Sequence, residues 1–212
     1  NKIKTANSIG IETKHVQLDG EIEQKEAEKI IIEESIETDA IMLQLPIPKH
    51  LDEKILINLI PQCKDVDGLT DLNMGMLVNN HPYAIVPATA MGVYKIINYM
   101  LETGDLTGVD VTVVNRSQLI GKPLQALLTN HNATVTVCHS RTQNLSALTQ
   151  MADILIVAIG RPQFVTADMV KEGAVVIDVG INRLDSGKLV GDVDFENVEP
   201  KASYITPVPG GV

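Results

Sequence analysis

The stretch Val111-Thr-Val-Val114-Asn115-Arg-Ser-Gln-Leu-Ile-Gly121-Lys-Pro123 decides the fold of the second half of the chain. The run 111–114 is typical of a buried parallel strand, and proline is favoured as the first residue of a helix. A strand, a tight turn and a helix start together predict a phosphate cradle, because free N–H groups and the helix dipole attract anions there. An ordinary strand-to-helix turn remains an alternative interpretation.

This turn lacks the glycine-rich fingerprint of dinucleotide-binding folds. One glycine remains, Gly121, and Asn115 stands where a first turn glycine would help. Asparagine tolerates positive φ better than most residues, so we expect the turn to survive with Asn115 in that conformation. We also expect the Asn115 side chain to crowd an approaching pyrophosphate.

Apolar runs and helical segments alternate around this stretch. A helix is expected from about Gly92 to Thr103, and helical segments separate the later apolar runs, the last of them short. Strands that alternate with helices of this length indicate a parallel sheet built from βαβ units. Asp185-Ser-Gly187 predicts a hairpin turn. The expected strands are 111–114, 134–137, 154–158 and 175–178, and the hairpin strands are 181–184 and 188–190.

The end of the second expected strand favours NADP over NAD. NAD-binding folds usually place Asp or Glu there to hold the ribose hydroxyls, whereas this chain has Cys138-His-Ser-Arg-Thr142. A cation or hydroxyl in place of an acid suits a 2′-phosphate, and Arg116 lies in the first turn. Arg116 and Arg141 could equally be solvated surface charges.

The third and fourth strands end in small residues. Gly160 and Gly180 would allow a ligand to approach the backbone closely, and ligands of open α/β sheets lie beyond the carboxyl ends of the strands. Plain turn chemistry is the alternative.

The first half is expected to be a smaller α/β region. Asp52 predicts a capped helix that runs to Ile60, and the proline- and glycine-rich stretch 61–90 is expected to be mostly loop. We place the domain boundary near Pro87–Met91, which gives domains of 1–90 and 91–212. The other expected elements are the end of a helix closed by Gly10, a strand at 15–18, a helix at 21–35 and a buried strand at 40–45.

Polar groups near the ends of these elements mark a candidate substrate site. Gln44 interrupts an apolar run, where an unsatisfied amide would cost free energy. Asp65 and Asp67 lie two residues apart, so in an extended segment only one can face a cleft. A carboxylate there suits a substrate with paired N–H groups, although such residues are more often solvated. No His or Cys spacing predicts a metal site, and no nucleophile elbow supports a hydrolase triad.

Composition narrows the class of protein. The chain has 212 residues, 44% hydrophobic and 21% charged, which is enough to bury a core. A net charge of −10 and 3% aromatic residues argue against nucleic acid as a partner. No apolar run is long enough to span a membrane, and two cysteines fit a reducing cytoplasm. We expect the 212 residues to be the middle of a longer chain.

Several motifs in one order resemble a known family, methylenetetrahydrofolate dehydrogenase/methenyltetrahydrofolate cyclohydrolase, over essentially the whole of residues 2–212. No one motif is decisive, but together they are very specific. They are Gln44-Leu-Pro-Ile-Pro48, Lys64-Asp-Val-Asp-Gly68, 115–123, Asn132-Ala-Thr-Val-Thr136 with Cys138-His-Ser140, Asp178-Val-Gly-Ile-Asn182, Gly191-Asp-Val193 and Thr206-Pro-Val-Pro-Gly-Gly211.

The resemblance implies two domains, an N-terminal α/β folate-binding domain and a Rossmann-like NADP-binding domain, with the folate cleft between them. It implies a hydride transfer from 5,10-methylenetetrahydrofolate to NADP⁺, then hydrolysis of the methenyl product to 10-formyltetrahydrofolate, a one-carbon donor for purine biosynthesis. A homodimer is expected as well. Lys2 matches the catalytic lysine of the family, and its folate-stacking tyrosine would precede the chain.

The resemblance also assigns the other site residues. Gln44 matches the glutamine that contacts the lysine, and Asp67 matches the aspartate that holds the pterin ring. Gly210 and Gly211 match a loop that returns to the folate. The positions expected to bind the cofactor are Asn115, Arg116, Ser117, His139, Ser140, Gly160, Gly180 and Ile181, with Arg116 and Ser140 near the 2′-phosphate.

Two departures from the family pattern keep alternatives open. Ala88 and Ala90 replace a cysteine and a proline before a helix, and Asn115 replaces a glycine. One alternative is a cyclohydrolase with weak or absent dehydrogenase activity. The other is a non-catalytic relative that binds folate or nucleotide.

Overall fold

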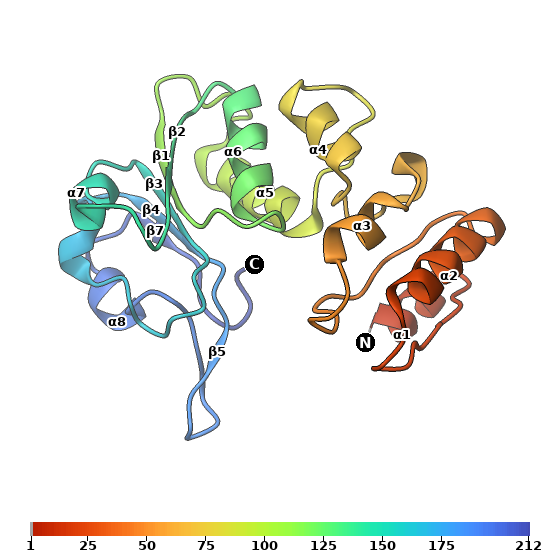
Figure 1. Ribbon diagram of the computed structural model, residues 1–212. Coiled ribbons are helices and arrows are strands. Elements are labelled where there is room, and N and C mark those ends of the chain that lie inside the picture. The colour runs from red at the N-terminus through yellow and green to blue at the C-terminus, as the bar shows by residue number, and fades with distance from the viewer. Residues whose placement is uncertain (1) are drawn as a thin grey trace. The chain divides into compact units, whose positions relative to one another are not determined.

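The computed structural model describes residues 2–212, which divide into two compact units, one that ends at Lys64 and one of residues 65–212 (Figure 1). Each unit is described by itself. The expected domain boundary between residues 90 and 91 stays a prediction.

The second unit is built on a parallel sheet of five strands in the order β2-β1-β3-β4-β7. The chain therefore turns in opposite directions from β1 and β3, and the crevice between their carboxyl ends is where ligands of such sheets bind. The α/β class and the four expected strands are confirmed, and β7 adds a fifth. The strands are β1 (Asp110–Val114), β2 (Thr134–Cys138), β3 (Ile154–Val157), β4 (Val175–Asp178) and β7 (Tyr204–Ile205).

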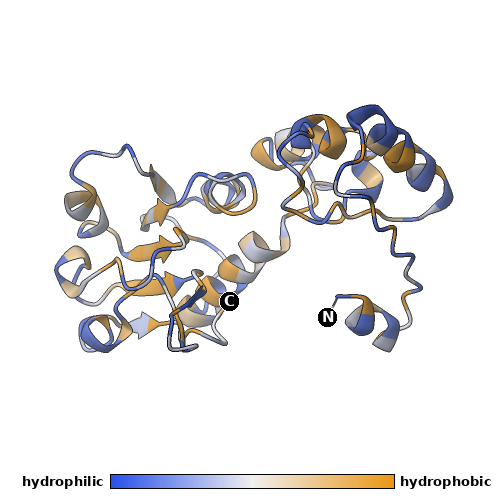
Figure 2. Cartoon of the chain, turned by 60° about the horizontal axis from the view of Figure 1, so that its bottom comes forward, coloured by the Kyte–Doolittle hydropathy of each residue, from blue (hydrophilic) through white to orange (hydrophobic). Residues whose placement is uncertain are grey.

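Helices cover both faces of this sheet because side chains alternate along the strands. Val111 and Val113 face the cluster of α5 and α6, whereas Val114 belongs to the cluster on the other face, beside α7 and α8. Figure 2 shows the apolar strands lying between the helices. The helices are α5 (Ala88–Leu101), α6 (Gly121–Asn130), α7 (Leu145–Thr149) and α8 (Phe195–Val198), with a short 3₁₀ turn, η2 (Ala167–Met169).

Of two expected connecting segments, the hairpin agrees with the structure and the stretch 61–90 differs from it. The expected hairpin is confirmed as β5 (Asn182–Arg183) and β6 (Leu189–Val190), with Gly187 in its turn at φ +82°. The stretch 61–90, expected to be mostly loop, also contains the helix α4 (Asp71–Val78), which the sequence did not predict. The Thr70 side chain caps α4, and Asn73 exchanges hydrogen bonds with the backbone of Ile85, so local polar side chains rather than hydrophobic periodicity build this helix.

The first unit has a small core of helices and loops. Ala27 and Ile31 of α2 pack with Leu56 of α3 in one apolar cluster. Asp52 caps α3, as expected, through the N–H groups of Lys54 and Ile55. The elements are α1 (Lys2–Ser8), α2 (Gln24–Glu37), α3 (Glu53–Asn58) and the 3₁₀ turn η1 (Gln62–Lys64).

The two strands expected in this unit are wrong. Residues 15–18 have no regular structure, and 40–45 form a bridge at Ile41, whose N–H donates to the carbonyl of Lys64, rather than a ladder. Side chains along 40–45 alternate between exposed and half-buried, so the apolar run covers one side of the core and is not enclosed. Among residues 2–212, no helix has the length and apolar character needed to cross a membrane.

An ion pair at the amino edge of the sheet generates a pH-dependent prediction. Asp153 lies 2.5 Å from Lys171 Nζ and accepts the N–H of Asp110, and these bonds lower the pKa of the Asp153 carboxyl. A lowered pKa in the folded state adds stability above the ordinary carboxyl pKa, and this is lost as the pH falls through the lowered value.

We therefore expect Asp153→Asn to reduce the free energy of unfolding near neutral pH by no more than about 1 kcal/mol, because the pair is exposed. The deficit should shrink as the solution is acidified. Urea unfolding at several pH values measures it, with the exposed Asp185→Asn as a control. A deficit that is independent of pH would contradict the assignment.

Candidate active site

The carboxyl ends of β1 and β3 meet where the strand order reverses, and Asn115 joins them. The Asn115 Nδ2 donates to the carbonyl of Ala158, and its Oδ1 accepts the N–H groups of Ser117 at 2.7 Å and Gly121 at 3.0 Å. The expectation of positive φ at Asn115 is wrong. The side chain folds into the turn and holds it by hydrogen bonds, because an amide can donate to one strand end and accept from the other.

The N–H groups of this turn are mostly used within the turn. Ile120 donates to Ser117 Oγ and Lys122 donates to the carbonyl of Ser117, in addition to the two bonds to Asn115. The expected cradle of free N–H groups is therefore wrong for these amides. Position 121 requires glycine, because a Cβ there would overlap the backbone of Asn115. The turn thus presents a closed, rigid surface.

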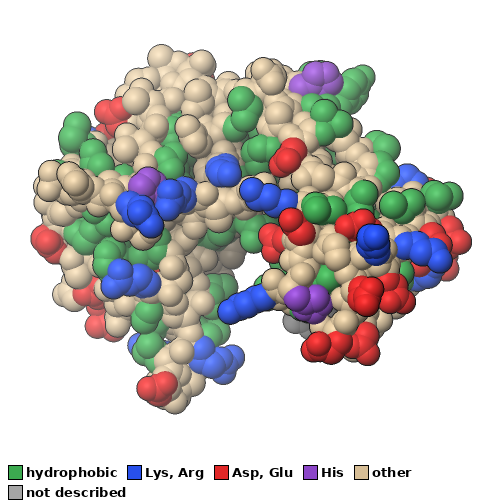
Figure 3. Space-filling model, in the orientation of Figure 1, with side chains coloured by type: hydrophobic (Ala, Val, Ile, Leu, Met, Phe, Trp, Pro, Cys, Tyr) green, Lys and Arg blue, Asp and Glu red, His purple; other side chains and the backbone are tan. Residues whose placement is uncertain are grey.

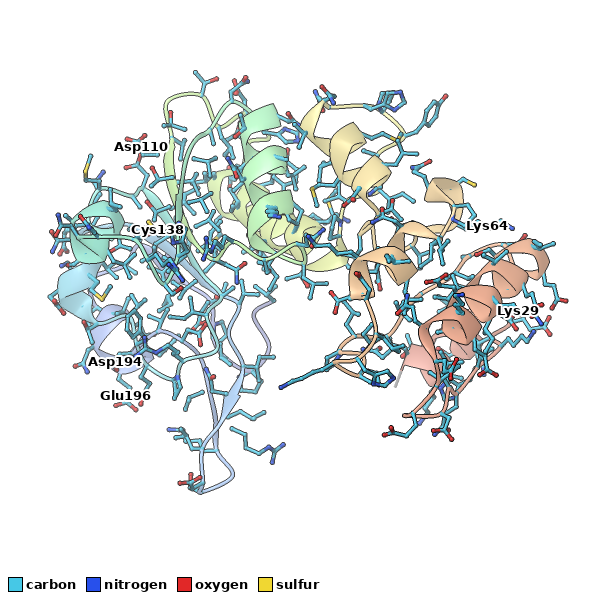
Figure 4. All side chains as sticks on the ribbon, viewed as in Figure 1. Lys29, Lys64, Asp110, Cys138, Asp194 and Glu196 are labelled. Atoms are coloured by element: carbon cyan, nitrogen blue, oxygen red, sulfur yellow. The ribbon has the colours of Figure 1, made fainter. Side chains whose placement is uncertain are left out.

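Cationic and hydroxyl side chains lie at the ends of β1 and β2. The register pairs Val114 with Cys138, so the residues that follow, Asn115-Arg116 and His139-Ser140, emerge from adjacent strands. Arg116, Ser140 and Arg141 are exposed. Figure 3 shows basic side chains and a histidine gathered near the end of β2, where Figure 4 labels Cys138. This arrangement can bind an anion such as a 2′-phosphate.

The ends of β3 and β4 contribute Gly160, Gly180 and Ile181. Gly160 is exposed and has φ +65°, and Ile181 is 63% exposed. Gly180 is buried, and a Cβ there would overlap the carboxylate of Asp192. The glycine therefore makes room for a carboxylate, which differs from the expected close approach of a ligand.

Two buried aspartates organise this edge, and the sequence did not single out either as a site residue. Asp178 accepts the N–H groups of Gly180, Asp192 and Val193, and burial raises the pKa of the Asp178 carboxyl. Asp192 is fully buried. The sequence feature that could have identified them is an acid close to a glycine in an apolar segment: Asp178 lies two residues before Gly180, and Asp192 directly follows Gly191.

The C-terminal loop is attached to the same edge. The buried Thr206 Oγ accepts the N–H of Asp178 at 2.8 Å. Gly210 has φ +104°, and a Cβ on Gly211 would lie 2.7 Å from the carbonyl oxygen of Pro207. The loop that carries both glycines therefore follows β7 and is attached through Thr206 to the end of β4.

The first unit brings Lys2 and Gln44 together by itself. Lys2 Nζ donates to Gln44 Oε1 at 3.1 Å and lies 3.1 Å from Met42 Sδ, while Gln44 Nε2 donates to the carbonyl of Leu45. Lys2 is exposed, and the ion pairs seen among residues 2–212 do not include it. An amine beside a neutral amide and a thioether is held in place without a carboxylate partner, so it can exchange a proton with a bound molecule.

The two acids near the start of the second unit differ in environment. Asp65 is buried and accepts the N–H groups of Leu69 and Thr70, so it stabilises the chain before α4. Asp67 is half-buried. Lys64, the last residue of the first unit, donates to the carbonyls of Ser35 and Thr38 at the end of α2. A ligand-binding role for Asp67 stays a prediction.

Comparison with known proteins agrees with this geometry. Residues 87–212 match the model of the tetrahydrofolate dehydrogenase/cyclohydrolase NAD(P)-binding domain, and residues 1–67 match that of the catalytic domain. The chain belongs to the tetrahydrofolate dehydrogenase/cyclohydrolase family.

Relatives of this family resemble the whole chain. It is 50% identical to the bifunctional protein FolD of Acholeplasma laidlawii, covering all of this chain and 76% of that protein. The crystal structure of FolD from Campylobacter jejuni superposes with a TM-score of 0.93 at 42% identity, over 99% of this chain and 74% of that one. The Trypanosoma brucei FolD, solved with NADP cofactor and an inhibitor, has a TM-score of 0.90 at 36% identity over the same shares.

The Asn115 turn generates a stability prediction. Asn115→Ala removes a side chain that makes three hydrogen bonds to the turn, so we expect the free energy of unfolding to fall by about 1–3 kcal/mol. Urea unfolding measures the change. Asn197→Ala, at an exposed asparagine of α8 that bonds Asp194, should cost less. Equal small effects would contradict the turn-holding role of Asn115.

Proposed function

We propose that this chain oxidises 5,10-methylenetetrahydrofolate to the methenyl form with NADP⁺ and hydrolyses that product to 10-formyltetrahydrofolate. The observation that carries the proposal is the similarity of the whole chain to bifunctional enzymes of this family, one of them solved with NADP. The close contact between Lys2 and Gln44 supports the hydrolytic half.

The second unit suits the cofactor. We assign Arg116, His139 and Ser140 to the 2′-phosphate end of the cofactor. We assign Asn115, Ser117, Gly160 and Ile181 to the walls that the dinucleotide lies against. The exposed cations at the ends of β1 and β2, where an NAD enzyme would have an acid, support NADP. When bound, NADP⁺ supplies the nicotinamide carbon that accepts the hydride.

The residues of the first unit suit proton handling at the folate. In the hydrolytic step, water adds to the methenyl carbon and loses a proton, and one C–N bond then breaks with protonation of the released nitrogen. Lys2 Nζ is assigned to the transfer of these protons, and Gln44 to holding the amine in place. Asp67 is assigned to the N–H groups of the pterin ring. Gly210 and Gly211 are assigned to a loop against the folate.

The proposal extends to the oligomeric state, the partners and the cellular location of the protein. We propose a cytoplasmic homodimer with folate one-carbon derivatives as its small-molecule partners and neither nucleic acid nor membrane among its partners. Cys63 and Cys138 are both free thiols, which fits a reducing compartment.

Cofactor reduction tests the oxidative half. With 5,10-methylenetetrahydrofolate as substrate, we expect absorbance of reduced nicotinamide to appear with NADP⁺ and to be much weaker with NAD⁺. Preference for NAD⁺ would contradict the role of the cations at β1 and β2, and no reduction with either cofactor would remove the dehydrogenase.

Variants of Lys2 test the hydrolytic half. Lys2→Gln should reduce the hydrolysis of 5,10-methenyltetrahydrofolate by about 10²-fold or more, the range of general acid–base catalysis. Hydride transfer depends on the alignment of two rings and should fall less. The matched control is Lys4→Gln, an exposed lysine on the same helix, which should retain both activities. Equal losses in both variants would contradict the assignment.

The cyclohydrolase with a weak dehydrogenase makes a distinct prediction. If Asn115 obstructs the cofactor, Asn115→Gly should raise the affinity for NADP⁺. The side chain instead lies folded into its turn, so we expect no gain, as measured by titration of NADP⁺ in a calorimeter.

A further inference from the structure

Three consecutive backbone amides at the end of β3 converge on one buried carboxylate. The Asp192 Oδ2 accepts the N–H groups of Ile159 at 2.5 Å and Gly160 at 3.0 Å, and its Oδ1 accepts that of Arg161 at 2.8 Å. The Asn182 Nδ2 adds a fourth bond to Oδ1 at 2.9 Å. Asp192 is fully buried, so these donors replace the water that the carboxylate gives up.

Successive amides around a residue of positive φ form a concavity that binds anions. Here Gly160, at φ +65°, lies in the middle of the three amides, and the anion that fills the concavity is a side chain of the same chain. The amides therefore point toward Asp192. Because these three amides all donate to Asp192, they are not free to bind an external phosphate. A ligand at the carboxyl edge of the sheet would contact the other side of this loop.

The carboxylate is itself held firmly. Asp178, at the end of β4, accepts the N–H groups of Asp192 and Val193 at 3.0 and 2.8 Å. Each carboxylate packs against a glycine near the other aspartate. A Cβ on Gly180 would overlap the Asp192 carboxylate, and a Cβ on Gly191 would overlap the Asp178 carboxylate. The end of β4 thus fixes Asp192, and Asp192 fixes the end of β3.

The loop that Asp192 holds also forms one wall of the crevice where the strand order reverses. Its first residue, Ala158, accepts the hydrogen bond from Asn115 at the end of β1. Beyond Arg161, the N–H of Gln163 donates to the carbonyl of Gly191, and that of Val165 donates to the carbonyl of Asp192. The Arg161 guanidinium lies 4.2 Å from the centre of the Phe164 ring. The loop is therefore held along its length, and the buried Asp192 carboxylate binds its turn at residues 159–161.

We propose that Asp192 is a positioning residue for the cofactor: its carboxylate fills the amide concavity at residues 159–161 and so sets the wall against which NADP binds. The proposal rests on the proposed function, because it concerns the dehydrogenase step. Hydrolysis of 5,10-methenyltetrahydrofolate, which we assign to Lys2, Gln44 and Asp67, does not depend on this wall.

Asp192→Asn tests the proposal with little change of shape. The amide NH₂ group cannot accept the two N–H groups that it would face, so the loop must move. We expect the KM for NADP⁺ to rise by about tenfold or more while kcat changes much less, because the displaced wall weakens cofactor binding and a tenfold loss of affinity is only about 1.4 kcal/mol. Hydrolysis of added 5,10-methenyltetrahydrofolate should be unchanged. Hydrogen exchange at residues 159–161 should be faster than in the unaltered chain.

The matched control is Asp194→Asn, two residues along the chain, where a partly exposed carboxylate bonds Asn197 (Figure 4). It should leave the KM for NADP⁺ unchanged. A folded Asp192→Asn protein with an unchanged KM, or with equal losses in both activities, would overturn the proposal. If the unaltered chain has neither activity, the proposed function fails instead.

A milder variant tests the role of Asp192 if the Asp192→Asn protein does not fold. Asn182→Ala removes one of the four donors and leaves the three backbone amides in place. We expect a smaller rise in the KM for NADP⁺, about two- to fivefold, with kcat and hydrolysis retained, because one hydrogen bond is worth about 1 kcal/mol. An unchanged KM in this folded variant overturns the proposal.

Discussion

The buried carboxylates of Asp178 and Asp192 hold the carboxyl edge of the sheet together. Asp178 binds the backbone of residues 192 and 193, its own N–H donates to Thr206, and Asp192 binds the loop after β3. Burying two carboxylates costs free energy that is offset here by donors on each of them. Like charges side by side add to this cost, and Asp192 contributes to the raised pKa of Asp178. The gain is a single geometry for several loops that would otherwise move separately.

The loops at the carboxyl edge of the sheet are fixed before a cofactor binds. Asn115 closes the turn after β1, the two aspartates fix the ends of β3 and β4, and the C-terminal loop leaves from Thr206. Fixed loops need little reordering when a ligand binds, which lowers the entropic cost of binding. Lys2 and Gln44, the pair that we propose for proton handling, need none of these contacts, because both residues belong to the first unit. The proposed proton-handling pair and the proposed cofactor wall are thus built by separate units of the chain.

Four strands of the second unit could be predicted because their apolar runs are short and regular, and β1, β3 and β4 are buried along nearly their whole length. The two-residue strand β7 was missed because it is too short to show such a run. The run 40–45 has similar residues but pairs its backbone only at Ile41, and composition does not reveal how many neighbours a strand has. The helix α4 was missed because polar side chains, Thr70 and Asn73, build it.

At the site, a sequence motif could suggest which residues belong together but not what each one contacts. Asn115 was expected to affect the turn through its backbone, whereas its amide holds the turn by hydrogen bonds. Gly180 was expected to admit a ligand, whereas it makes room for Asp192. Both errors have one cause, since long-range contacts between strand ends decide where a side chain points.

One isotope experiment tests the central claim most directly. The chain would be incubated with NADP⁺ and 5,10-methylenetetrahydrofolate carrying deuterium on the bridging carbon, in water enriched in oxygen-18, and the products analysed by mass spectrometry. We predict deuterium in the reduced nicotinamide and oxygen-18 in the formyl group of 10-formyltetrahydrofolate. Deuterium transfer without formation of labelled formyl product would contradict the hydrolytic half, and the absence of both labels would contradict the account as a whole.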